Sequence, residues 1–284
     1  MLVLALDTST PVVTAGVVAL LRPHELLAES QQQPAPDAGP AAGAADGRGR
    51  PIPPGRPCRT LAEHTVTDAF GHAEHLMPLV TAALAEAGRA LAEVEAVVVG
   101  IGPGPFTGLR VGMATAEALG DALGVPVHGV PSHDAMARRA APSGTPAGKP
   151  HGEPDRESYG DFLVVTDARR REVYLSAYRE SVRRRLGPTV VAPAAIAGLL
   201  AEHEITPRWL TGAGAHLVTA VTGLAVREPA DPLAEHLVVC AARPLLTGAV
   251  PGPLTPLYLR RPDAVAPGAP KPVLPQDEPT GGRR

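Results

Sequence analysis

Aromatic residues, cysteines and basic charge are all scarce in this sequence, and each shortage excludes a class of protein. Aromatic residues make up only 3% of the 284 positions, so hydrophobic cores must be built from Ala, Val and Leu. The two cysteines, Cys58 and Cys240, form neither a metal-ligand spacing nor a disulfide framework, which is typical of a reducing cytoplasm. The formal net charge of −3 excludes the global basic field of many nucleic-acid-binding proteins.

Long hydrophobic runs are also missing. No uninterrupted apolar run reaches the roughly 18–20 residues that a membrane helix needs. The apolar N-terminus carries no basic residues, and Asp7 interrupts it. We therefore expect a first strand rather than a signal peptide, no membrane partner and a cytoplasmic location.

Three segments are rich in proline and glycine: 31–59, 142–160 and 262–284. In the first, 12 of 29 residues are Pro or Gly, too many for a packed element. Such segments bury too little apolar area to offset chain entropy, so we expect two flexible insertions and a disordered tail.

The rest of the chain alternates strand and helix signals in two successive blocks, which predicts an α/β protein with mixed sheets and a duplicated, two-lobe architecture. The first lobe is expected over 1–131, completed by a helix at 233–247, and the second over 132–232. The patterns predict strands at 2–6, 12–20, 61–67, 94–99, 127–130, 162–167, 172–178 and 208–211, and helices at 72–88, 107–123, 132–141, 194–202, 213–221 and 233–246.

A glycine-rich loop follows the apolar strand at 94–99 and opens a helix, the arrangement that an anion-binding site uses. Its glycines, from Gly102 through Gly104 to Gly108, match neither the dinucleotide fingerprint nor a Walker loop. Pro103 and Pro105 also remove two backbone donors from any phosphate cradle. The alternative is a rigid turn that packs strand against helix.

A second candidate phosphate loop, Asp7-Thr-Ser-Thr10, ends the first strand and is similar to the first phosphate loop of actin-like and sugar-kinase folds. Such loops usually contain glycine, which is missing here, so side chains that satisfy turn amides are the favoured interpretation. The residues of a vestigial nucleotide site are then Asp7, Thr8, Gly102, Gly104, Thr107 and Gly108.

Histidines and arginines form the remaining candidate sites. His72 and His75 lie one helical turn apart, a spacing suited to a metal or to a partner surface. His133 and Asp134 form a single pair after a strand. The triplets 169–171 and 183–185 are all arginine. Charge runs of this kind are usually solvated turns, and the alternative hypothesis is a modest contribution to RNA contact.

Five stretches together resemble the TsaB (YeaZ) family, although Pro105 stands where the family loop usually has serine. They are Leu4-Ala-Leu-Asp-Thr-Ser-Thr10, His72-Ala-Glu-His-Leu-Met-Pro-Leu79, Gly102-Pro-Gly-Pro-Phe-Thr-Gly-Leu-Arg-Val-Gly112, Asp167-Ala-Arg-Arg-Arg-Glu-Val-Tyr174 and Pro256-Leu-Tyr-Leu-Arg260.

The resemblance implies an ASKHA (actin-like, Hsp70, sugar kinase) fold and a non-catalytic function. A TsaB-like subunit binds and activates its catalytic paralogue TsaD, and an ATPase, TsaE, joins them. The complex forms N6-threonylcarbamoyladenosine at position 37 of tRNAs that read ANN codons. The resemblance thus implies ATP and a metal in the partner subunits, no cofactor in this chain, and tRNA contact through the complex.

In the catalytic paralogue a His-x-x-x-His motif holds the metal, and the matching positions here are Ser132 and Met136. A hydroxyl and a thioether do not replace two imidazoles. His133 lies one residue out of register. The resemblance therefore implies that the catalytic metal has been lost.

The resemblance also assigns an interface to the helix at 72–88, either with the catalytic paralogue or in a homodimer. One apolar face would cover the sheet and the other a partner helix. The predicted interface residues are His72, His75, Leu76, Leu79, Val80 and Ala83. Two enzymatic alternatives remain: a nucleotide-dependent kinase or ATPase that uses Asp7 and the glycine loop, and a metallopeptidase-like protein.

Overall fold

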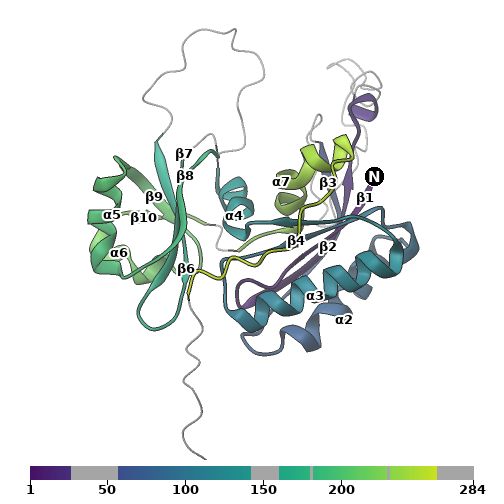
Figure 1. Ribbon diagram of the computed structural model, residues 1–284, viewed down its shortest axis with the longest axis horizontal. Helices are drawn as coiled ribbons and strands as arrows, with labels where there is room; N and C mark the ends of the chain where they lie inside the picture. Colours follow the sequence, from purple (N-terminus) through teal and green to yellow (C-terminus); the bar gives the residue numbers. More distant parts are fainter. Residues whose placement is uncertain (27–56, 142–159, 180–181, 229–230, 261–284) are drawn as a thin grey trace, which may run out of the picture.

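The computed structural model describes residues 1–26, 57–141, 160–179, 182–228 and 231–260, which form two α/β lobes side by side (Figure 1). The segments expected to be flexible, 31–59, 142–160 and 262–284, lie outside the described residues, apart from 57–59 and 160. Residues 57–59 correct the first boundary, because strand β3 begins at Cys58, which pairs with Leu20.

The first lobe is built on a five-stranded mixed sheet with the order β3-β2-β1-β4-β5. β1 and β2 form the predicted antiparallel hairpin, with Leu2 opposite Ala19, and β4 and β5 continue parallel to β1. The strands are β1 Leu2–Asp7, β2 Val12–Leu20, β3 Cys58–Thr67, β4 Ala96–Gly100 and β5 Val127–Val130.

Helices cover both faces of this sheet. α2, His72–Glu86, and α3, Phe106–Leu123, pack on one face over Leu4, Leu6 and Val97. α7, Ala234–Thr247, packs on the opposite face over Val3, Ala5 and Val98. Although α7 comes from the end of the chain, it therefore completes the core of the first sheet.

The second lobe repeats this topology in the order β8-β7-β6-β9-β10. Its first three strands are antiparallel and its last two are parallel, as in the first sheet, which confirms the predicted duplicated α/β fold. The strands are β6 Asp161–Asp167, β7 Val173–Arg179, β8 Arg184–Val191, β9 Pro207–Thr211 and β10 Ala225–Val226.

Helix α4, Ser132–Ala140, lies between the two sheets (Figure 1). It contacts α7 of the first lobe, and its Met136 packs against Phe162 and Trp209 of the second. The other face of the second sheet is covered by α5, Ile196–Glu202, by a 3-10 turn at Ala215–Leu217 and by the short helix α6, Thr219–Thr222. The single helix predicted at 213–221 is thus wrong.

After α7, residues 249–260 contain no regular structure and form what we call the strap. The strap runs along the first sheet to the β6–β7 hairpin of the second lobe (Figure 1). The Leu257 amide donates to the Ile101 carbonyl at 2.9 Å, and an Arg260 guanidinium NH donates to the Ala168 carbonyl at 3.1 Å. Within the described ranges, no helix has the length and apolar character that crossing a membrane demands.

Candidate functional site

The predicted nucleotide residues meet at the carboxyl ends of β1, β4 and β5. Asp7 is fully buried and accepts hydrogen bonds from the Ser9 amide at 2.8 Å, the Ser9 hydroxyl at 2.6 Å and the Ser132 hydroxyl at 2.6 Å. Burial raises the pKa of the Asp7 carboxyl, and the hydroxyls oppose that effect. The Asp7 carboxylate therefore has its hydrogen bonds supplied by residues of this lobe and of the start of α4.

The glycine loop packs directly on the turn after Asp7. A Cβ at Gly104 would overlap the carbonyl of Ser9, and one at Gly108 would lie 2.5 Å from the carbonyl oxygen of Thr8. The Thr8 hydroxyl donates to the Gly108 carbonyl at 2.7 Å. Backbone thus contacts backbone where a phosphate cradle would need space, which favours the rigid-turn interpretation.

Gly102 and Thr107 complete the predicted set in different ways. Gly102 has φ +94°, a conformation that favours glycine, and its amide donates to the Ser132 hydroxyl at 3.3 Å. Thr107 is exposed in the first turn of α3. Five of the six residues are therefore packed together, and Thr107 lies at their surface.

The two positions aligned with the paralogue's metal ligands are occupied by residues with other roles. The Ser132 side chain is fully buried and bonds Asp7, and Met136 is fully buried in the core of the second lobe. Across the described part of the chain, no three His, Cys, Asp or Glu side chains group as metal ligands would. These residues do not fit a metal centre.

His133 connects α4 to the second sheet. Its Nδ1 lies 2.9 Å from the Ser176 hydroxyl and its Nε2 lies 2.9 Å from the Thr166 hydroxyl. Burial, with a smaller contribution from the nearby Arg184 charge, lowers the pKa of His133 to about 3. Asp134 instead accepts from the Tyr178 hydroxyl, so His133 and Asp134 do not act as a pair.

His72 and His75 point to separate partners within the lobe. The His72 Nε2 lies 2.9 Å from the Thr10 carbonyl oxygen, and the His75 Nε2 lies 3.0 Å from the Asp68 carboxylate. Backbone amides, led by that of Phe70, together with His75 lower the pKa of Asp68 to about 2. Both imidazoles thus hold the start of α2 in place.

Burial excludes four of the six predicted interface residues from the outward face of α2, and one of the four is His72, whose ring lies against the Thr10 carbonyl. Leu76, Val80 and Ala83 are at most 1% exposed, because they face the first sheet. Leu79 is partly exposed. The outward face of α2 is formed instead by Ala73, Glu74, Met77, Pro78, Thr81, Ala85 and Glu86.

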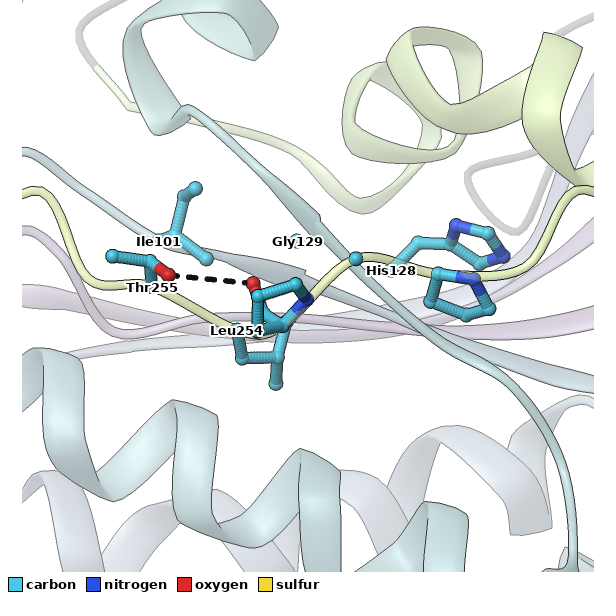
Figure 2. Close-up of a pocket in the computed structure, with 8 residues that line it drawn as sticks. Ile101, His128, Gly129, Leu254 and Thr255 are labelled. Atoms are coloured by element: carbon cyan, nitrogen blue, oxygen red, sulfur yellow. Dashed lines mark hydrogen bonds between the residues drawn. The ribbon is translucent and has the colours of Figure 1, made fainter.

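A cavity of about 180 Å³ lies between β5 and the strap (Figure 2). Ile101, His128 and Gly129 line it from the sheet side, and residues 251–255 close it from the strap. Burial lowers the pKa of His128. The sequence did not indicate any of the residues that line this cavity as candidate site residues.

Sequence reasoning missed the bond between Asp7 and Ser132, although a signal for it exists. Asp7 ends β1 and Ser132 lies two residues after the end of β5, and β1, β4 and β5 are adjacent and parallel. The carboxyl ends of parallel strands meet at one edge, so side chains at these ends come together.

Comparison with known proteins decides the family. The model described as "TsaD: tRNA N6-adenosine threonylcarbamoyltransferase" matches residues 67–223, more than half of the chain. The chain belongs to the TsaD family. Within this family it is TsaB/YeaZ-like, since TsaB of Haemophilus influenzae is 32% identical over 41% of this chain and 44% of its own length.

The longer matches are to uncharacterized mycobacterial proteins. That of Mycobacterium tuberculosis strain H37Rv is 40% identical over 92% of this chain and 93% of its own length. That of Mycobacterium leprae is 42% identical over 98% of this chain, which spans only 58% of that relative. The solved structure of YeaZ from Pseudomonas aeruginosa shares the fold, with a TM-score of 0.54, 24% identity and coverage of 89% of this chain and all of that one.

Proposed function

We propose that this TsaD-family chain is a non-catalytic subunit that binds and activates a catalytic, TsaD-like paralogue. The complex forms N6-threonylcarbamoyladenosine at position 37 of tRNAs that read ANN codons, in the cytoplasm. A TsaE-like ATPase joins the two subunits, and the partners supply the ATP site and the metal. In the absence of the paralogue the same surface pairs two copies of this chain.

One observation carries the proposal: the positions of the paralogue's metal ligands are Ser132 and Met136, both buried and both used in packing. The close contact of Gly104 with the Ser9 carbonyl also supports a subunit without its own phosphate site. Both features oppose the kinase and metallopeptidase alternatives, because each of those activities needs a site that these side chains fill.

The outward faces of α2 and α3 are the proposed partner surface. α2 contacts α3, and α3 presents Ala114, Ala118 and Ala122 to solvent at a spacing of four residues. On α2 Met77 is 40% exposed, and Phe70, just before α2, is 94% exposed. Small residues allow close helix approach and large apolar residues supply buried area, which suits a helix-bundle contact.

The test compares Met77→Glu with Val221→Glu, a similarly exposed apolar residue on the second lobe. A charge buried at the interface should weaken association with the TsaD-like protein at least about tenfold, whereas the control should change nothing. Calorimetry measures the association, and synthesis of the modified adenosine with and without this chain measures activation.

Two results would overturn the proposal. One is modified-adenosine synthesis that proceeds equally well without this chain. The other is binding of ATP-Mg to the isolated chain tighter than about 10 μM, together with turnover. Equal effects of Met77→Glu and Val221→Glu would reject the α2–α3 surface alone.

A further inference from the structure

The turn between β6 and β7 has three consecutive arginines in a left-handed conformation. Arg169, Arg170 and Arg171 have φ values of 63°, 54° and 64°, and all three are exposed. The turn is closed by backbone bonds from the Ala168 amide to the Glu172 carbonyl and from the Glu172 amide to the Arg169 carbonyl. The backbone of the turn is thus well defined.

Residue type and backbone conformation conflict at this turn. Left-handed φ is favourable for glycine and tolerated by Asn and Asp, whereas other residues lose about 1–2 kcal/mol each. The fold alone would therefore favour glycine or asparagine at 169–171. Residues with strained backbone conformations concentrate at functional sites, so a function of the arginine side chains would explain why arginine stands at these positions.

The second arginine triplet, 183–185, differs in its charge partners. It lies at the other end of the same sheet, where Arg184 and Arg185 begin β8. There Arg184 pairs with Asp134 at 3.5 Å, and Arg185 pairs with Asp161. These two charges are neutralised within the fold.

Two acidic groups lie near the first triplet. Asp167 accepts the Arg169 amide at 2.7 Å and lies 4.0 Å from its guanidinium, and Glu172 pairs with Arg260 of the strap. Among the described residues, no ion pair is found for Arg171. Arg171 therefore keeps its positive charge at the tip of the turn.

The strap adds an aromatic group beside the turn, and α3 adds a basic one. Tyr258, two residues before Arg260, packs against Phe106 with ring centroids 4.5 Å apart. The Arg110 guanidinium lies 5.7 Å from the Tyr258 ring centroid and donates to its hydroxyl at 2.9 Å. Both rings are partly exposed, in a chain with only eight aromatic residues.

We propose that this basic surface binds the phosphate backbone of tRNA directly; it consists of Arg110, Arg169, Arg170, Arg171 and Tyr258. Guanidinium groups match phosphate oxygens in a bidentate geometry, and a partly exposed aromatic pair offers a base a stacking face. The choice of tRNA among RNAs rests on the proposed function. The surface gives this chain its own contact with the substrate, beyond the contact made through its partner.

The test measures binding of a fluorescent tRNA transcript to the full chain, alone and with the TsaD-like protein, at 50 and 200 mM KCl. The triple variant Arg169→Asn, Arg170→Gly, Arg171→Asn places favoured residues in the turn, so its melting temperature should be equal or higher. Its affinity for tRNA at 50 mM KCl should fall at least about tenfold. The slope of the logarithm of affinity against the logarithm of KCl concentration should become smaller in magnitude by about 2–3.

A matched pair of single variants controls for net charge. Arg171→Glu and Arg183→Glu make the same charge change at opposite ends of one sheet, and both residues are exposed. Arg171→Glu should weaken tRNA binding about tenfold, and Arg183→Glu should change it less than about twofold.

Three results would overturn the inference: no binding of tRNA by the wild-type chain at 50 mM KCl, equal effects of the two single variants, or displacement of tRNA by polyglutamate as readily as by RNA of equal charge. Association with the TsaD-like protein is measured in the same variants without RNA. If the arginine variants still associate with the TsaD-like protein and bind tRNA as tightly as the wild type, this inference alone is rejected. If the wild-type chain does not associate with the TsaD-like protein, the proposed function is rejected.

Discussion

At the scale of single residues, Gly104 is a position where the fold leaves no room for a side chain. Its Cα lies against the backbone of Ser9, and a Cβ there would overlap the Ser9 carbonyl rather than a movable side chain. Gly104→Ala should therefore lower the free energy of unfolding by about 2–3 kcal/mol in urea titrations, because one backbone segment must shift.

The control for this prediction is Gly198→Ala in α5. A Cβ at Gly198 meets no atom within 4 Å, and alanine favours a helix over glycine, so this variant should gain about 0.5–1 kcal/mol. Equal stability of the two variants would show that the loop and the turn after Asp7 do not pack as described.

At the scale of elements, the strap holds the β6–β7 turn to the first lobe through Arg260, which contacts the Ala168 carbonyl and Glu172. Arg260→Ala should accelerate hydrogen exchange at the amides of Ala168 and Glu172 about tenfold, since local opening of the turn becomes easier. Mass spectrometry of the exchanging peptide measures the effect. Arg243→Ala, an exposed position on α7, should leave that peptide unchanged.

Elements with a clear period were predicted well, and irregular ones were not. The β1–β2 hairpin consists of two mainly apolar runs, and the structure places both strands where the sequence predicts them. β8 was missed because Gly187 and Pro188 interrupt its pattern; as an edge strand it tolerates a proline that a central strand would not. The period of α2 identified its apolar residues but not which of them face solvent, because that depends on how α2 sits against the sheet.

At the scale of the whole molecule, His133 links the stability of the two lobes to pH. Its folded pKa of about 3 lies far below the ordinary value of 6.5. As the pH falls through 6.5, His133 binds a proton in the unfolded chain but stays neutral in the folded chain. The free energy of unfolding is therefore highest above pH 6.5 and decreases toward pH 3.

The measurement is the free energy of unfolding at pH 7.5 and 5.0 for the wild type and for His133→Gln. The wild type should lose about 2 kcal/mol more than the variant over this interval, because the variant lacks the titrating ring. All other histidines contribute equally to both proteins. Identical pH dependence would mean that the ring between Thr166 and Ser176 is accessible to protons in the folded state.

The position of α7 in the chain also constrains how the protein is made. Leu237, Val238 and Ala241 cover the face of the first sheet that holds Val3, Ala5 and Val98, yet more than 130 residues separate α7 from the nearest of those strands in sequence. During synthesis the first lobe therefore leaves the ribosome with one apolar face bare, and it stays bare until the entire second lobe has followed. The lobe that begins the chain is the last to finish folding, and protection of its sheet during translation becomes a requirement of the fold itself.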